Sequence, residues 1–359
     1  MHIPFAKHFT DTKENNRPFS DRDLYLLVFP LFIERLLQMF VGMMDTFIIS
    51  YTGEASVSGV SLIDQVSNVY IFVSTAIAAG GAVITSQYIG SKNKDKAGES
   101  ASQLLMISTF FAIIIAFFTY TGKSPLLHFL FGRVEDDVMT AAITYLAITA
   151  LSYPMIAIYD SGAALYRSLG MTNVTMKLSI ISNLINLIGN FIGVFILHAG
   201  VAGVAWPTLF ARSFQAIVIT VLCFRKDKAA CYRLKHIFRF NADLLKRILH
   251  VAVPNGVENG VFQFVKVAMS SIVSLFGTTQ IAANGIAQTF WSLTNSFGNA
   301  GGPAFTTVIG QCMGDENVDA AEYYFKRFAR MLVWIGGGWN IFLSLPPKAK
   351  VKARARARA

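Results

Sequence analysis

The apolar stretch Leu24–Ser50 constrains the fold more than any other part of the sequence. About 20 consecutive apolar residues are enough for a helix to cross a bilayer. This stretch is long enough, yet it carries Glu34, Arg35 and Asp45, and each charge near the bilayer centre costs roughly 2.5–3.5 kcal/mol. These charged side chains must therefore face protein or water.

Three polar residues of this stretch share one side of the expected helix. At 100° per residue, Glu34, Gln38 and Asp45 lie within about 40° of one another, and the two carboxylates are roughly 16 Å apart along the axis. The pattern predicts a polar track through a membrane helix. A polar contact between helices, or a helix boundary that puts Glu34 among the headgroups, is the simpler interpretation; charged residues inside a span more often mark function.

The composition indicates an all-α, polytopic membrane protein. The chain has 359 residues, of which 53% are hydrophobic and only 14% charged, with a mean hydropathy of +0.49, which is too apolar for a soluble protein of this size. Nine apolar runs are candidate spans, namely Leu24–Ser50, Val66–Ile89, Leu104–Tyr120, Val138–Tyr159, Leu178–Leu197, Val204–Phe224, Ile248–Leu275, Ile281–Ile309 and Phe328–Leu345. The three cysteines and six histidines have no metal-ligand spacing, and we expect no metal site and no cofactor.

The basic residues lie between alternate spans. The segments before span one and after spans two, four, six and eight hold 20 Lys and Arg, whereas the opposite loops hold only Lys123 and Arg133. This asymmetry predicts a plasma-membrane protein with a cytoplasmic N-terminus, and it explains the net charge of +10 without a nucleic-acid partner. The basic segment 225–247 either lies on anionic membrane lipids or is a solvated connector.

An internal repeat divides the chain. Residues 30–97 match residues 254–321 at a constant offset of 224 with twelve identical pairs, including Gln87 with Gln311 and Gly90 with Gly314. The copies begin at spans one and seven, so both enter the membrane from the same side and predict two lobes related by an axis along the membrane normal. We expect a monomer with a cytoplasmic segment 1–23, an N-lobe 24–224, a linker 225–247, a partial C-lobe 248–345 and a basic tail 346–359.

Several spans carry polar stripes. The polar residues of span five lie within a narrow arc of the expected helix, and so do those of span seven. Spans two and eight carry polar faces at equivalent positions of the repeat. For a single Asn, a hydrogen bond between helices worth about 0.6–2 kcal/mol is the simpler interpretation. Taken together, the stripes predict a solvated substrate cavity lined by Gln38, Asp64, Asn68, Asn284, Gln288, Asn295 and Asn299.

Several segments resemble one transporter family. They are PLFIERLLQMFVGMMDTFIIS at 30–50, SQYIGSKN at 86–93, LYRSLGMTN at 165–173, NLINLIGN with GVAGVAWPT between 183 and 208, and VPNGVENGVFQFVK at 253–266. Together they resemble the MATE (multidrug and toxic compound extrusion) transporters over residues 21–339. The resemblance implies twelve helices in two six-helix lobes around a V-shaped cavity, and export of small organic cations driven by H⁺ or Na⁺.

The resemblance also implies an ion-coupling set. Asp45 matches the acid of the family's first helix, and Asn186 and Asn190 match the N-xxx-D pair of the fifth helix, with Asn190 in place of the Asp. Thr208 matches a hydroxyl of the sixth helix, and Glu258 lies on the seventh, earlier than the acid of several members. With Glu34, these five residues complete the expected ion-coupling set.

The chain is shorter than the family pattern, which continues for three more helices. The ninth run gives way to PPKAKVKARARARA at 346–359, so we expect an incomplete C-lobe and a tail foreign to the fold, from a frameshift or truncation. A genuine regulatory tail is the alternative. On this basis we expect the chain by itself to be a poor transporter.

The leading hypothesis is export of amphipathic organic cations by H⁺ or Na⁺ antiport. A flippase for a lipid-linked precursor would favour a cavity rich in Arg and Lys, and the sequence offers mainly Arg212 and Lys266. A non-transporting membrane protein, such as a sensor or a pseudogene product, is a further alternative. We do not expect an enzyme, because no nucleophilic or metal constellation is recognisable.

The charge asymmetry generates a prediction of topology. Single cysteines at Lys94, Arg233 and Arg327 should be labelled from the cytoplasmic side only, and cysteines at Gly53 and Gly277 from the outside only. Labelling of position 233 from outside would overturn the assignment.

Overall fold

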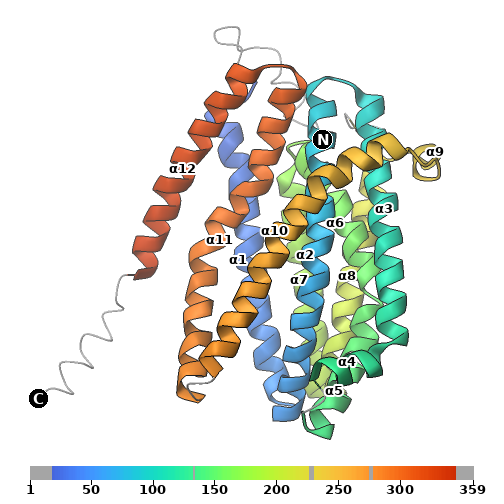
Figure 1. Cartoon of the computed structure of the whole chain (residues 1–359), viewed down its shortest axis with the longest axis vertical. Helices are drawn as coiled ribbons and strands as arrows, with labels where there is room; N and C mark the ends of the chain where they lie inside the picture. Colours follow the sequence, from blue (N-terminus) through green and yellow to red (C-terminus); the bar gives the residue numbers. More distant parts are fainter. Residues whose placement is uncertain (1–17, 132–133, 226–229, 275–277, 345–359) are drawn as a thin grey trace, which may run out of the picture.

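The computed structural model describes residues 18–131, 134–225, 230–274 and 278–344, with side chains described only in part between 264 and 297. These residues form helices and no β-strand, which confirms the expected helical class (Figure 1). In chain order the elements are α1 Asp21–Ser50, α2 Glu54–Gly90, α3 Lys94–Thr121, α4 Lys123–Phe131, α5 Asp136–Ala150, α6 Tyr153–Ser168, α7 Thr172–Phe191, the π-helix η3 Ile192–Ile196, α8 Ala202–Cys223, α9 Leu234–Ile237, α10 Ala242–Ser274, α11 Thr278–Gly314 and α12 Val318–Ser344.

The helices follow the expected spans with one main difference. Among the described residues, α1, α2, α3, α7 with η3, and α8 are long and apolar enough to cross a membrane, and the pair α5 and α6 meets the same criterion with a bend of 45°. The span expected over 138–159 is therefore formed by two helices that meet at a bend. Pro154 lies in the first turn of α6, a position that proline favours because its missing N–H is not needed there, and the chain bends between the two helices.

The last three expected spans correspond to α10, α11 and α12, which have 33, 37 and 27 residues. The short helix α4 was not predicted. The tail 346–359 and most of the segment 1–23 lie outside the described residues, so the prediction of a foreign tail is not addressed by the structure.

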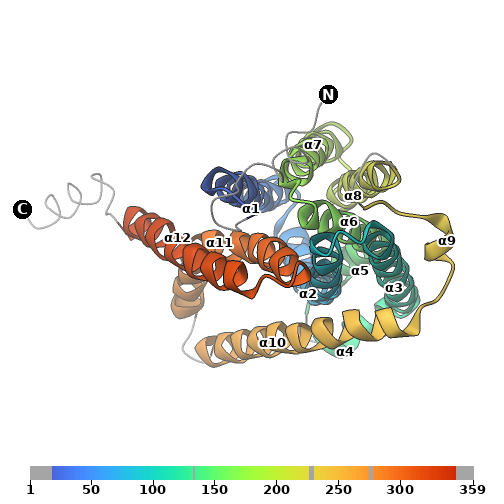
Figure 2. The same ribbon diagram turned by 90° about the horizontal axis from the view of Figure 1, so that it is seen from above.

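Helix α2 lies at the centre of the molecule. It packs against α3, α5 and α6 on one side and against α10 and α11 on the other. Seen from above, α10 runs along one side of the bundle, while α11 and α12 extend away from it beside α1 (Figure 2). The two copies of the sequence repeat therefore meet at α2 and α11.

The contact between α2 and α11 is reciprocal. A Cβ added at Gly90 would lie 2.7 Å from the carbonyl carbon of Gln311, and one added at Gly314 would lie 2.7 Å from that of Gln87. These are two of the identical pairs of the repeat, so each copy contributes a glycine that packs on the other copy's glutamine backbone. Small residues let helices approach this closely.

The basic segments gather at the same end of the bundle as this crossing (Figure 1). Arg327 before the middle of α12 binds Asp21 at the start of α1, with Nη2 2.6 Å from Oδ2. Arg233 binds Asp95 with Nη2 2.6 Å from Oδ1. One end of the molecule is thus basic, as the charge pattern predicted, while the side of the membrane to which it belongs stays a prediction.

Substitution of the crossing glycines should destabilise the protein. Gly90→Ala or Gly314→Ala forces a methyl group into a helix backbone, and overpacking of this kind costs about 1–3 kcal/mol. Gly42→Ala on α1 is the matched control, because its added Cβ meets nothing within 4 Å and alanine is the better helix former. The measurement is thermal unfolding of the detergent-purified chain; equal stability of all three variants would contradict the packing described for α2 and α11.

Candidate functional site

Helices α1 and α7 run in the same direction and are joined by polar contacts at three levels. Near the basic end, Thr172 Oγ1 donates to the Leu26 carbonyl at 3.1 Å. Further along, Thr175 Oγ1 donates to Glu34 Oε2 at 3.4 Å. At the far end, Asn190 Nδ2 donates to Asp45 Oδ1 at 2.7 Å. The expected shared face of Glu34 and Asp45 is therefore the face of α1 that meets α7.

Asp45 is the centre of a cluster formed by α1, α7 and α8. Besides its bond from Asn190, it lies beside the Asn186 amide, which is 3.1 Å from Asp45 Oδ1 and 3.0 Å from Thr208 Oγ1. Asn186 and Asn190 are buried, with 7% and 0% of their surfaces exposed, whereas Asp45 is half-buried. The structure thus brings together four of the six residues expected to couple to an ion.

This cluster contains oxygen atoms without a positive partner. Among the described residues, no Lys or Arg forms an ion pair with Asp45. The Asn190 Oδ1 atom is also buried and accepts no hydrogen bond from the described chain, which costs free energy unless another donor or a cation is bound. A carboxylate and amide oxygens at the ends of two helices form a suitable site for H⁺ or Na⁺.

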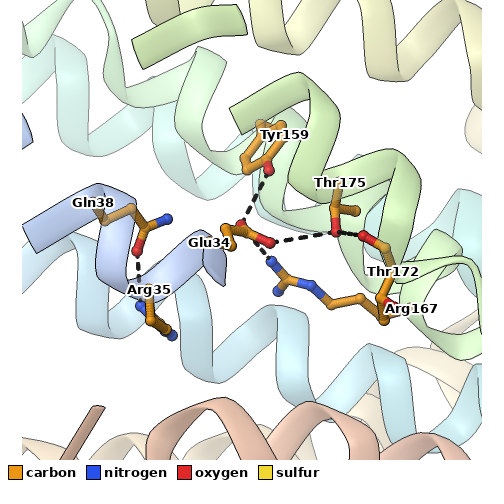
Figure 3. Close-up of polar contacts among 7 residues, drawn as sticks. All are labelled: Glu34, Arg35, Gln38, Tyr159, Arg167, Thr172 and Thr175. Atoms are coloured by element: carbon orange, nitrogen blue, oxygen red, sulfur yellow. Dashed lines mark hydrogen bonds and ion pairs between the residues drawn. The ribbon is translucent and has the colours of Figure 1, made fainter. Parts of the chain in front are cut away.

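Glu34 has a different environment, shown in Figure 3. Its Oε1 atom lies 3.1 Å from Arg167 Nη2 and 3.4 Å from the Tyr159 hydroxyl, and its side chain is 4% exposed. Glu34 therefore joins α1 to α6 through a buried ion pair with Arg167, and to α7 through the hydrogen bond from Thr175. Asp160, seven residues before Arg167 on α6, has a different partner, because its Oδ2 atom accepts a hydrogen bond from Ser74 Oγ at 2.7 Å.

Helix α11 closes over the end of α6 next to this ion pair. Thr307 Oγ1 donates to the Arg167 carbonyl at 2.8 Å, and Gln311 Nε2 donates to the Ser168 carbonyl at 2.7 Å. The last carbonyl groups of a helix have no partner within that helix, so these two side chains cap α6 from the second copy of the repeat. The ion pair of Glu34 consequently lies where the two copies meet.

The residues expected to line a cavity are only partly brought together. Exposed side chains are found at Gln38, Asp64, Asn68 and Asn299, and Glu258 of the ion-coupling set is exposed as well. Gln38 Oε1 accepts from Arg35 Nη1 at 3.2 Å (Figure 3). Asn295 Nδ2 donates to the Trp291 carbonyl at 3.0 Å. The side chains of Asn284 and Gln288 lie outside the described residues.

Sequence reasoning missed the capping of α6 and the partner of Glu34. The identical repeat pair of Gln87 and Gln311 was a usable signal for the crossing. For the partner of Glu34, the only signal was the presence of Arg167 near the end of an apolar span. The spacing of polar residues along α1 predicts which face of that helix is polar, but it does not predict which helix packs on that face.

The sequence matches the MatE family model over residues 30–192 and 254–348. It is 28% identical over 329 residues to the "Uncharacterized transporter YisQ" of Bacillus subtilis, covering 90% of this chain and 70% of the relative. It is 26% identical over 352 residues to the "Probable multidrug resistance protein NorM" of Thermotoga maritima, covering 93% of this chain and 72% of the relative.

Solved structures share the fold. One, described as the outward-facing conformation of a multidrug resistance MATE family transporter of the MOP superfamily, aligns with a TM-score of 0.84 at 21% identity, over 90% of this chain and 72% of that one. A MOP superfamily transporter from Pyrococcus furiosus, whose binding pocket is described as having reverse polarity, aligns with a TM-score of 0.81 at 20% identity, over 92% and 75%.

Glu34→Gln should destabilise the protein strongly, because it leaves the Arg167 guanidinium without its partner inside the bundle. Breaking a buried pair in this way costs about 3–5 kcal/mol. The double variant Glu34→Gln with Arg167→Gln should lose less stability than the sum of the two single variants. Unfolding of the purified chain in detergent measures both quantities.

The matched control is Glu322→Gln on α12, whose carboxylate also pairs with a basic side chain, Lys326, but at the exposed surface. We expect no measurable change in stability there. Equal effects of Glu34→Gln and Glu322→Gln would show that the buried ion pair does not hold α1, α6 and α7 together.

Proposed function

The chain belongs to the MatE family, and from this premise we propose that it is a secondary active transporter that exports amphipathic organic cations in exchange for H⁺ or Na⁺. The observation that carries the proposal is the contrast between the two acids of α1. Glu34 is neutralised by Arg167, whereas Asp45 has amide and hydroxyl neighbours and no basic partner among the described residues.

A carboxylate without a positive partner in apolar surroundings is costly. Binding of a proton or Na⁺ removes that cost, and the half-buried position of Asp45 leaves one side of the carboxylate open to such an ion. The unpaired Asn190 oxygen lies on a residue bonded to Asp45 and supplies a further ligand. We therefore assign ion coupling to Asp45, Asn186, Asn190 and Thr208.

The driving force follows from the direction of ion movement. A cation that moves inward gains about 2.3 kcal/mol per 100 mV of membrane potential. If the lobes rock about the α2–α11 crossing, Asp45 meets the outside in one state and the inside in the other. The exposed residues Gln38, Asp64, Asn68 and Asn299 supply the polar surface for the exported cation, with Asp64 as its negative group.

We place Glu34 and Glu258 outside the coupling site. Glu34 positions α6 through its ion pair with Arg167 and α7 through the hydrogen bond from Thr175, next to the α11 side chains that close this end of the molecule. Glu258 is exposed on α10. The two lobes, 24–224 and 248–345, with the linker 225–247, remain the proposed organisation.

Asp45→Asn should abolish export driven by a gradient while leaving the fold intact, because it keeps the shape of the side chain but removes its charge. The measurement is ethidium efflux from liposomes that contain purified 1–359 under an imposed pH or Na⁺ gradient, with the wild-type rate, expected to be low, as the reference. Glu322→Gln, at an exposed ion pair remote from the site, should export like the wild type. Export by Asp45→Asn at the wild-type rate would refute the coupling role.

A second readout does not depend on export. If Na⁺ is the coupling ion, NaCl should raise the unfolding temperature of the wild type above that in choline chloride, and Asp45→Asn should lose the difference. Asn190→Asp restores the second acid of the family pattern and should increase the Na⁺ effect.

A further inference from the structure

Helices α10 and α11 hold an ammonium group against two aromatic rings. Lys266 Nζ lies 3.7 Å from the centroid of the Trp291 ring and 5.1 Å from that of Phe262. The two rings are themselves 5.7 Å apart and inclined by 31°. Such an arrangement binds a cation through the negative faces of the rings, and Trp is the most effective residue for it.

Lys266 lies on the part of α10 that follows Pro254. The first half of α10 packs on α2, where Gly256 approaches Ala76. Further along the helix, the ammonium group of Lys266 contacts Trp291 of α11. Its charge therefore faces the neighbouring helix α11.

The aromatic pair is open to a ligand. Phe262 is 48% exposed and Trp291 40% exposed, whereas the lysine between them is half-buried. Among the described residues no Asp or Glu forms an ion pair with Lys266. In the described chain the ammonium group is thus held by the rings, which is the interaction that an organic cation would also use.

We propose that Trp291 and Phe262 form a binding site for organic onium cations, and that Lys266 is a tethered occupant which the exported cation displaces. The proposal rests on the proposed function, because it names the subsite at which the exported cation binds. Two positive charges cannot share one ring face without strong repulsion, so lysine and onium cation alternate. The returning lysine would favour release of the cation, since a tethered competitor acts at a high effective concentration.

The size of the expected effect follows from the interaction that is exchanged. A cation–π contact contributes an amount equivalent to about 2- to 30-fold in affinity, depending on how dry the site is. Lys266→Gln should therefore tighten binding of an onium cation by this factor, and Trp291→Leu should weaken it by a similar one. Lys266→Arg keeps a cation that stacks on aromatic rings and should give no gain.

The test is a double-mutant cycle on binding of tetraphenylphosphonium, measured by equilibrium dialysis with the full purified chain in detergent and without any gradient. The gain from Lys266→Gln should disappear when it is introduced together with Trp291→Leu. An undiminished gain in that background would show that Lys266 only repels cations through space, and would overturn the site. Wild-type affinity of Trp291→Leu would overturn it equally.

Controls separate the site from general effects. Trp206→Leu on α8 removes another partly exposed Trp, 47% exposed, and should leave binding unchanged; an equal loss there would count against the site. If Trp291→Leu does not fold, Trp291→Tyr replaces it, with an intermediate loss expected and no loss contradicting the proposal.

Failure of this site and failure of the proposed function give different results. A coupled cycle in a chain that does not export ethidium would retain the site and remove the transport function. If the chain exports ethidium along a gradient but Lys266→Gln and Trp291→Leu have additive effects on binding, the transport function stands and the site is refuted.

Discussion

The close approach of α2 and α11 is the contact on which the rest of the structure depends. Gly90 and Gly314 each pack on the backbone of the other helix, which brings the two copies of the sequence repeat together at the basic end of the molecule. This approach also carries Thr307 and Gln311 to carbonyl groups at the end of α6. A larger side chain at either glycine would separate the helices and remove these caps.

A second constraint comes from the surroundings of the helices, where water is not available to pair polar groups. The two acids of α1 meet this constraint in different ways. Glu34 is held by an ion pair with Arg167 at the closed end, and Asp45 by amides from α7 further along the same helix face. The first arrangement is self-sufficient, and the second is completed by a cation in the function that we propose. On this proposal, one helix carries both a structural acid and a coupling acid.

The sequence predicts the helices and their repeat well. Long apolar runs leave few alternatives to membrane-spanning helices, and the two copies of the repeat align without gaps. It also places Glu34 and Asp45 on one face of α1, and that face is confirmed as the one that meets α7. It does not predict which side chains from other helices reach that face, since Arg167 lies 133 positions from Glu34. The break between α5 and α6 was visible only as Pro154, which predicts a kink but not a 45° bend. The contact of Lys266 with Trp291 likewise depends on how α10 and α11 pack. The sequence of either helix alone does not predict that packing.

The central claim is that the polar faces of α2 and α11 meet water between the two copies of the repeat. Thiol accessibility tests it most directly, in a chain whose three native cysteines are replaced by alanine. Asn68→Cys and Asn299→Cys, both at exposed positions, should react with a membrane-impermeant thiol reagent added from one side of proteoliposomes. Phe210→Cys should stay unreactive. Phe210 is 63% exposed on α8 at the outside of the bundle (Figure 2), where we expect its side chain to face lipid that the reagent does not enter. Equal protection of all three cysteines would contradict the account, because the polar faces would then lie in lipid or dry protein.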